Sequence, residues 1–215
     1  EADLEQALEA LADALGARNT APRINAASHD GALPTGPVTL DGLGALFNAL
    51  LPEDAVVIDE AVTSGRAFTG AMMGALPHDW LNIMGGSIGW GPAAATGAAI
   101  AAPDRKVVAF EGDGSAQYTL QALWTMAREG LDVTMVVFAN RAYKILLGEL
   151  NNVGAAAPGA NALSMLTLDR PDLDWVALAK GYGVEAGRAK TLEELAVQFR
   201  RGVAVAGPYL IEVVM

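Results

Sequence analysis

The chain has 215 residues, of which 52% are hydrophobic and 18% are charged, a composition typical of a packed globular protein. Its formal net charge of −11 argues against nucleic acid as a partner, because phosphate backbones attract basic surfaces. There is no cysteine, which excludes disulfides, zinc–thiolate sites and a cysteine nucleophile, and which fits a reducing cytoplasm.

The first 37 residues predict a helix and a linker. Leucines at positions 4, 8, 11 and 15 recur with helical spacing, and Gly16 can end the helix. Residues 17–37 contain three prolines and two glycines without periodicity, which indicates a linker. The acidic N-terminus has neither Met nor a signal-peptide pattern. We therefore expect residues 1–37 to hold the last helix of a preceding domain and a linker, and residues 38–215 to form the main domain.

From residue 38 onward, strand patterns alternate with helical patterns. The expected helices cover residues 38–50, 63–74, 92–101, 118–128, 172–181 and 191–204, and the expected strands cover 55–59, 80–84, 107–111, 133–138 and 209–214. This alternation predicts an α/β fold with a doubly wound, mainly parallel sheet and helices on both faces. The uncharged run 81–102 contains five glycines and a proline, so we expect a buried strand, loop and helix there and no membrane span.

Two polar loops follow consecutive strands of the expected sheet. Asp113 comes just after the strand 107–111, and Asn140 comes just after the apolar strand 133–138. One strand–helix–strand crossover separates them, so both loops emerge at the same edge of the sheet. If the two strands are neighbours, about 4.8 Å apart, the two side-chain oxygens can share one hard cation. So few protein ligands suit Mg²⁺, which also takes phosphate oxygens from a cofactor.

Small residues around Asp113 suit a phosphate group. Gly112 and Gly114 permit a tight turn and a close approach of the main chain to phosphate oxygens. The N–H groups of Gly114 and Ser115, near the start of the next helix, can donate hydrogen bonds to those oxygens. Gly-Asp-Gly alone is also a common turn, but an Asn one crossover later makes a metal and diphosphate site the stronger interpretation.

The segment Gly112–Gly114, followed after 24 residues by Ala139 and Asn140, resembles the motif of the thiamine diphosphate (ThDP) dependent enzymes. The motif ends in two asparagines, so Ala139 departs from it, whereas Asn140 matches the asparagine that binds Mg²⁺ in the family. The resemblance further implies that the carbonyl of Ala142 binds the metal and that Tyr143 lies against the diphosphate. The implied cofactors are ThDP and Mg²⁺, and the implied metal ligands are Asp113, Asn140 and Ala142.

The resemblance covers residues 38–215 and is closest to the acetolactate synthase and benzoylformate decarboxylase branch. The segments that carry it are Gly112–Ser115 with Ala122–Trp124, Ala179–Val184 and Gly207–Val213. Classical pyruvate decarboxylases carry a glutamate where this sequence has Leu146, which favours the synthase or the aryl 2-oxo acid decarboxylase branch. The resemblance implies that the chain is the C-terminal, diphosphate-binding domain of such an enzyme.

A second glycine-rich loop, Met84–Gly91, and the segment after the first strand are further candidates. In similar enzymes a large aliphatic residue in this loop wedges the cofactor into a bent conformation, and Ile88 aligns with that residue. The carbonyl of Gly86 aligns with the acceptor for the aminopyrimidine ring. Thr63 and Ser64 are candidate diphosphate contacts by similarity, although a solvated turn with a helix N-cap would explain either hydroxyl as well.

The resemblance also implies what this chain lacks. In the family, the bound cofactor attacks a 2-oxo acid, CO₂ leaves, and the product is protonated or joined to a second carbonyl compound. The glutamate that activates the cofactor belongs to an N-terminal pyrimidine-binding domain, and no segment here resembles that domain. We therefore expect no catalytic residue in this chain, a pyrimidine-binding domain in the same or another chain, and a homodimer or homotetramer of the complete protein.

Two interpretations compete with an acetolactate synthase-like decarboxylase or carboligase. A dinucleotide-dependent oxidoreductase needs a glycine where Gln117 stands and an acidic residue where Asn140 ends the next strand. A non-catalytic or truncated ThDP-binding domain that acts only with a partner domain stays open as the second alternative. His29, His78 and Glu149 are more typical of solvated side chains than of catalytic groups.

Overall fold

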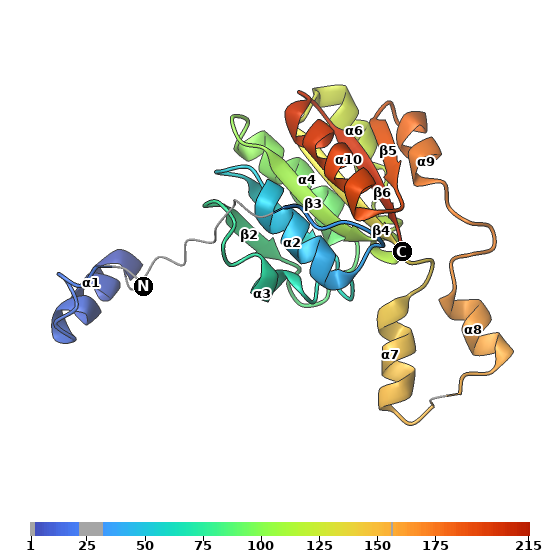
Figure 1. The fold of residues 1–215 in the computed structure, drawn as a ribbon, viewed down its shortest axis with the longest axis horizontal. Helices are drawn as coiled ribbons and strands as arrows, with labels where there is room; N and C mark the ends of the chain where they lie inside the picture. The colour runs from blue at the N-terminus through green and yellow to red at the C-terminus, as the bar shows by residue number, and fades with distance from the viewer. Residues whose placement is uncertain (1–2, 22–31, 156) are drawn as a thin grey trace.

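The computed structural model describes residues 3–21, 32–155 and 157–215, and in these residues six strands form one sheet (Figure 1). The strands are β1 (Val56–Glu60), β2 (Asp79–Asn82), β3 (Val107–Gly112), β4 (Val133–Ala139), β5 (Glu185–Ala189) and β6 (Tyr209–Val214). Their order is β2-β1-β3-β4-β6-β5, and every neighbouring pair runs parallel. The central strand β4 is almost continuously apolar because both of its faces are buried.

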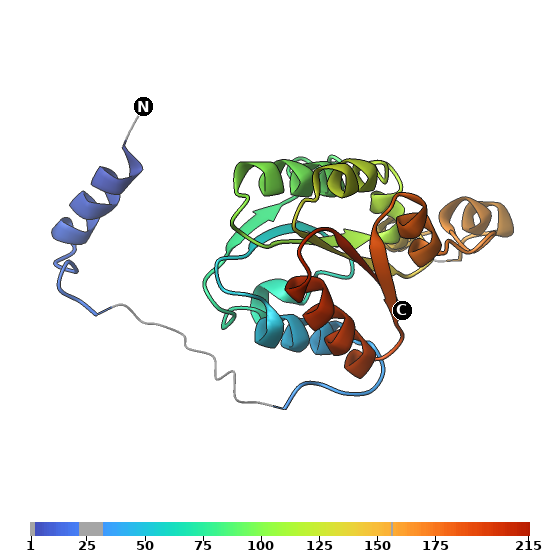
Figure 2. The ribbon, with the colours of Figure 1, turned by 90° about the horizontal axis from the view of Figure 1, so that it is seen from above.

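Helices cover both faces of the sheet (Figure 2). One face carries α2 (Leu40–Leu50), α3 (Phe68–Ala71) and α10 (Leu192–Ala204), and the other carries α4 (Trp90–Ala101), α6 (Ala122–Glu129) and α9 (Trp175–Gly181). The predicted α/β fold with a doubly wound sheet is therefore confirmed, and the described sheet is parallel throughout.

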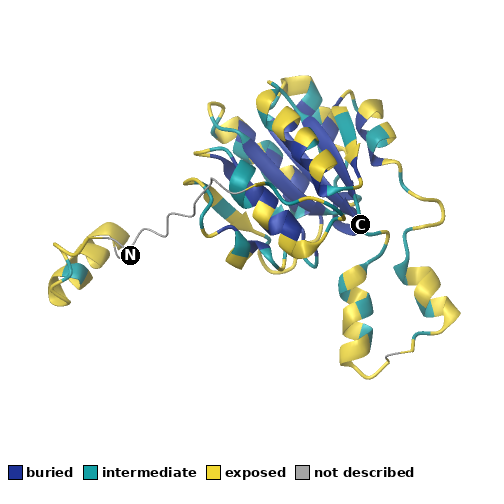
Figure 3. Cartoon of the chain, in the orientation of Figure 1, coloured by how far each residue is buried: buried dark blue, intermediate teal, exposed yellow. Residues whose placement is uncertain are grey.

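The two faces are packed with different kinds of side chain. On the first face, the ring centroid of Phe47 in α2 lies 4.6 Å from that of Phe110 and 5.1 Å from that of Phe199. On the second face, Ala95 and Ala99 of α4 are buried, and such small side chains let the helix backbone lie close to the sheet. Burial is greatest in the sheet between these layers (Figure 3), as expected for a fold with two apolar cores.

The order of the strands creates a crevice at the carboxyl ends of β1 and β3. The chain leaves β1 toward α3 on one face, and it leaves β3 toward α6 on the opposite face. The loops that follow these neighbouring strands therefore turn away from each other. Doubly wound sheets bind their ligands at such a switch in strand order, so the fold itself points to this edge of the sheet.

Within the part of the chain that the structure describes, three helices have no buried residue. α1 (Leu4–Ala14) forms where the leucine spacing predicts a helix, with Asp3 as its N-cap, and its leucines are exposed. α7 (Lys144–Asn152) and α8 (Ala160–Leu166) lie between β4 and α9 and stand apart from the main body (Figures 1 and 3). Each helix within the described ranges is too short or too polar to span a lipid bilayer. His29 lies outside the described residues, and the domain boundary near residue 38 stays a prediction.

Several element boundaries differ from the sequence prediction. The helix expected over residues 63–74 is a single turn, α3, in a stretch of turns that contains three glycines. The helix expected from residue 118 begins at Ala122, after a short helix α5 (Asp113–Ala116) and a turn. The sequence pattern also misses α8 and the strand β5. Edge strand β5 escapes prediction because its sequence, EAGRA, consists of polar and small residues, and only the last of its five residues is buried.

Candidate functional site

A pocket lies at the switch in strand order, between the loops that follow β1, β3 and β4. It is lined by the predicted residues Thr63, Ile88, Gly112, Asp113, Gly114, Ser115, Asn140, Ala142 and Tyr143. The pocket has six further lining residues, which come from the same loops and from the start of α7: Ala61, Val62, Tyr118, Lys144, Ile145 and Leu146. The predicted contacts Ser64 and Gly86 are not part of the lining.

The pairing of β3 with β4 brings Asp113 and Asn140 together. Gly112 and Phe138 are partners in the parallel register, so the two polar loops leave the sheet side by side. This adjacency, expected from the single crossover between the two residues, is what a shared cation requires. The binding of a metal by these residues stays a prediction.

Asp113 is almost completely buried, and main-chain N–H groups hold its carboxylate. The N–H of Arg141 donates to Oδ2 at 2.5 Å, and the N–H of Gly114 donates to Oδ1 at 2.9 Å. Burial raises the pKa of Asp113 to about 6, although these two hydrogen bonds act to lower the pKa. The negative charge of a carboxylate held in this way is only partly offset at neutral pH, and a bound cation would offset the rest.

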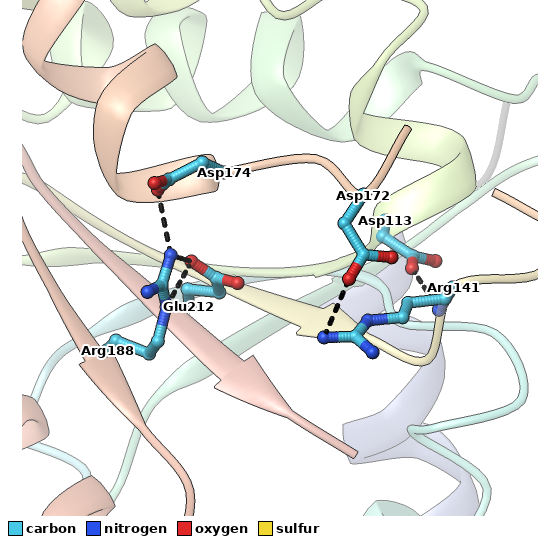
Figure 4. A network of polar contacts seen from close by, with 6 residues as sticks. All are labelled: Asp113, Arg141, Asp172, Asp174, Arg188 and Glu212. Atoms are coloured by element: carbon cyan, nitrogen blue, oxygen red, sulfur yellow. Dashed lines mark hydrogen bonds and ion pairs between the residues drawn. The ribbon is translucent and has the colours of Figure 1, made fainter. Parts of the chain in front are cut away.

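The guanidinium of Arg141 does not form an ion pair with Asp113 (Figure 4). Its Nη2 lies 3.3 Å from Oδ2 of Asp172, while Arg188 pairs separately with Asp174 and the buried Glu212. Among the described residues no cluster of three or more His, Cys, Asp or Glu side chains could hold a metal ion. A cation bound at Asp113 would therefore need further ligands from the main chain, from Asn140 and from a bound phosphate group. Mg²⁺ is commonly bound in this way, by few protein ligands together with phosphate oxygens.

The loop around Asn140 is a closed turn that is tied to a distant segment. Oδ1 of Asn140 accepts a hydrogen bond from the N–H of Ala142 at 3.1 Å, which is a typical Asx turn. The N–H of Tyr143 donates to the carbonyl of Leu166 at 2.9 Å, and Ala142 forms an antiparallel bridge with Thr167. The segment 143–166, which contains α7 and α8, therefore begins and ends beside the loop that follows β4 and contains Asn140.

The ring of Tyr143 leaves no room for a side chain at position 114, so this position needs a glycine. A Cβ atom placed on Gly114 would lie 2.7 and 2.9 Å from two ring carbons, closer than van der Waals contact permits. The ring therefore covers the turn in which the diphosphate is expected to bind, as the family resemblance implies for Tyr143. Ser115, in the first turn of α5, is buried beside Gly112 and lines the same pocket.

Ser64 and Gly86 have their polar groups engaged elsewhere. The hydroxyl of Ser64 is buried and points to the sulfur of Met215 at 3.6 Å, away from the pocket. The carbonyl of Gly86 accepts a hydrogen bond from the N–H of Ile88 at 2.9 Å. Thr63 and Ile88, by contrast, both reach the pocket, so the structure separates the neighbours Thr63 and Ser64.

Two buried glutamates beside the pocket escape the sequence analysis. Glu60 ends β1 and Glu111 lies on the neighbouring strand β3, directly opposite in the parallel register. Burial first, and the charge of Glu60 second, raise the pKa of Glu111 well above its usual range. Each glutamate sits at the end of an apolar strand, where a solvated turn is the usual explanation, so the sequence alone carries no signal for this pair.

The sequence and the structure of this chain are both similar to those of known enzymes. Residues 67–213 match the family of thiamine pyrophosphate enzymes in their C-terminal TPP-binding domain. The chain is 49% identical over 210 residues to a Mycobacterium tuberculosis protein that carries the name "Putative acetolactate synthase large subunit IlvX". It is 34% identical over 193 residues to the benzoylformate decarboxylase of Pseudomonas aeruginosa. The solved structure of a ThDP-dependent 4-hydroxybenzoylformate decarboxylase from Rhodococcus jostii RHA1 matches with a TM-score of 0.77 at 29% identity.

These matches extend over most of this chain but over a minor part of each relative. They cover 97%, 89% and 96% of this chain and 40%, 34% and 38% of the mycobacterial, pseudomonad and rhodococcal proteins, so the chain spans about two fifths or less of their length. The chain belongs to the thiamine pyrophosphate enzymes and contains their C-terminal ThDP-binding domain. The family resemblance drawn from the Gly-Asp-Gly and Asn motif is thereby confirmed.

Proposed function

We propose that this chain supplies the Mg²⁺ and diphosphate half of the active site of a ThDP-dependent 2-oxo acid decarboxylase or carboligase. The observation that carries the proposal is that Asp113 and Asn140 follow adjacent strands and line one pocket. Asp113 is buried, and the hydrogen bonds that it accepts come from main-chain N–H groups rather than from a cationic side chain. A divalent cation would complete such a site.

Each residue has a distinct role in this proposal. The side-chain oxygens of Asp113 and Asn140 and the carbonyl of Ala142 would hold Mg²⁺, while Ser115 and Tyr143 would contact the diphosphate. When bound, the cofactor supplies the electron sink that decarboxylation of a 2-oxo acid requires. The residues of this chain bind and orient it. The pocket measures about 140 Å³. That is well below the roughly 300–1,000 Å³ typical of complete ligand sites, which supports a site completed by another domain.

The substrate class comes from the relatives and from one side chain. One relative is named for acetolactate synthesis, and two are named for decarboxylation of benzoylformate or its 4-hydroxy derivative, which are aryl 2-oxo acids. Leu146 gives the pocket an apolar wall, which suits such substrates better than a glutamate at this position would. We propose a 2-oxo acid as the substrate, and an N-terminal pyrimidine-binding domain within a homodimer or homotetramer as the partner.

Calorimetric titration with ThDP, with and without Mg²⁺, tests the cofactor site. We expect binding that requires the metal and that weakens at least about tenfold in Asp113→Ala, because a charged metal ligand is lost. Asp79→Ala removes an equal charge at the amino end of β2, far from the pocket, and should leave the affinity unchanged. Metal-independent binding of NAD, or equal ThDP affinity in parent and Asp113→Ala, would contradict the proposal.

A decarboxylation assay tests whether the active site is shared between this chain and a pyrimidine-binding domain. We expect the 215-residue chain to release no CO₂ from pyruvate or benzoylformate, even when it is saturated with ThDP and Mg²⁺. The reason is that the glutamate that activates the cofactor in this family belongs to the pyrimidine-binding domain. Turnover by the chain without any added protein would show that its own residues complete the site.

A further inference from the structure

The loop Met84–Gly91 brings Ile88 into the pocket, but packing around the side chain of Ile88 itself contributes little to holding it there. Gly85, Gly86 and Gly89 have φ angles of 63°, 69° and 88°, so three of its residues use the left-handed region that favours glycine. Ile88 itself is 44% exposed. The position of Ile88 must therefore be set chiefly by the hydrogen bonds that anchor its main chain.

Glu60 provides that anchor from the end of β1. Its Oε1 accepts a hydrogen bond from the N–H of Gly89 at 2.6 Å, and its Oε2 accepts one from the N–H of Gly91 at 2.5 Å. The side chain of Glu60 is fully buried, so water does not compete for these bonds. Gly91 lies in the first turn of α4, where main-chain N–H groups have no partner within the helix, so the side chain of Glu60 supplies an acceptor that the helix itself lacks.

The same loop is held from its other side. The hydroxyl of Thr119 donates to the carbonyl of Gly89 at 2.7 Å. A Cβ atom on Gly89 would lie 2.5 Å from Cβ of Tyr118, and one on Gly91 would lie 1.8 Å from Oε1 of Glu111. The two glycines are therefore pressed against fixed neighbours, and the residue just before Gly89 has little freedom to move.

We propose that Glu60 is a positioning residue: acting through the N–H of Gly89, it sets where Ile88 stands in the pocket and thereby how firmly the thiamine part of the cofactor is held. This inference rests on the proposed function, because Ile88 needs a cofactor to act on. The thiamine part is what distinguishes ThDP from inorganic diphosphate. A change at Glu60 is therefore expected to alter the affinity for ThDP and to leave the affinity for inorganic diphosphate unaltered.

Calorimetry with these two ligands, each with Mg²⁺, tests the inference on the full chain. Glu60→Gln preserves the volume of the side chain but places an amide N–H₂ against one of the two glycine N–H groups. Thr119→Val removes the hydroxyl that holds the same peptide group from the other side. We expect each variant to bind ThDP about tenfold more weakly, as loss of one strong hydrogen bond predicts, and to bind diphosphate within about twofold of the parent.

A double-mutant cycle separates positioning from a general loss of stability. If Glu60 acts through Ile88, then Glu60→Gln should change ThDP affinity less than about twofold in an Ile88→Ala background. Tyr209→Phe is the matched control, because it removes a side-chain hydrogen bond to Gln198 at the amino end of β6. It should leave both affinities unchanged. An equal loss of ThDP affinity with and without Ile88 would overturn the inference.

Hydrogen exchange measured by mass spectrometry gives a readout that needs no ligand. In Glu60→Gln, exchange should quicken at residues 85–91 while the strands β3 and β4 keep their protection. Uniform loss of protection would show that Glu60 serves only the stability of the domain. Failure of the parent chain to bind Mg²⁺ and diphosphate would count against the proposed function instead. A parent that binds both ligands equally well would overturn the role given to Ile88 and Glu60.

Discussion

The main-chain N–H of Arg141 donates a hydrogen bond to the carboxylate of Asp113 at 2.5 Å, and this bond joins the loop after β4 to the loop after β3. Arg141 adopts a φ angle of 59°, uncommon for a residue with a side chain, and its guanidinium turns to Asp172 (Figure 4). The carboxylate of Asp113 is thus buried with little compensation of its charge. The arrangement suits a cation and lowers the stability of the metal-free fold.

Replacing Asp113 with Asn should stabilise the metal-free chain at neutral pH. The pKa of Asp113 rises from 3.8 to about 6 on folding, so the folded state binds more protons than the unfolded state between these values. Stability therefore falls as pH rises through this window, by about 3 kcal/mol for two pKa units. Asn removes this loss but weakens one hydrogen bond, worth about 1 kcal/mol. The expected net gain at pH 7.5 is about 2 kcal/mol.

Urea unfolding at pH 7.5 and at pH 4 measures this effect. The gain in the free energy of unfolding should disappear at pH 4, where Asp113 is protonated in the folded state of the parent. A variant that is less stable than the parent at both pH values would show that the carboxylate is well compensated without a metal.

The affinity for Mg²⁺ with diphosphate should increase as pH rises, whereas the stability of the metal-free chain should decrease. A proton on Asp113 competes with the cation, so the affinity should be constant above about pH 7 and fall toward tenfold per unit below about pH 6. Titrations at pH 5, 6 and 7.5 provide the comparison. Inorganic diphosphate itself gains a proton within this pH range, so its binding to Mg²⁺ in the absence of protein is measured at the same pH values as the control. Identical pH profiles for parent and Asp113→Asn would argue against Asp113 as the ligand.

Gly114→Ala should disturb the pocket through the ring of Tyr143. The added Cβ would lie 2.7 Å from the ring, so either the ring or the turn must move, at a cost of about 1–3 kcal/mol in the free energy of unfolding. Gly148 in α7 is the matched control, because a Cβ there meets nothing within 4 Å. Gly148→Ala should be neutral or stabilising by up to about 1 kcal/mol. Chemical denaturation of both variants makes the comparison, and equal stabilities would refute the contact.

Gly91→Ala tests how tightly the start of α4 is packed against the buried glutamates. A Cβ on Gly91 would overlap Oε1 of Glu111 at 1.8 Å, which these buried side chains cannot relieve without moving the helix. We expect destabilisation of about 3 kcal/mol or more. In the same helix, Gly97 faces open space, so Gly97→Ala should stabilise by about 0.5–1 kcal/mol. Thermal unfolding followed by circular dichroism would show opposite shifts, and shifts of the same sign would contradict this packing.

The sequence alone was sufficient for the architecture and for the adjacency of Asp113 and Asn140. Alternating strand and helix patterns follow from periodic burial, which is local information, and they predict the doubly wound sheet. The single crossover between Asp113 and Asn140 implies that the two loops share an edge, and the pairing of β3 with β4 confirms that adjacency. The family motif at the same positions then identifies the cofactor class.

Other features depend on neighbours that are distant in the chain, so only the tertiary structure could decide them. The edge strand β5 exists because β6 offers it hydrogen bonds, although its own sequence has no strand pattern. Thr63 and Ser64 are chemically alike in the sequence, and the structure directs Thr63 to the pocket and Ser64 to Met215. Glu60 meets Gly89 and Gly91 across 29 and 31 residues. Periodicity reports which side of an element is buried, whereas the partner of a buried polar group is set by how the elements pack.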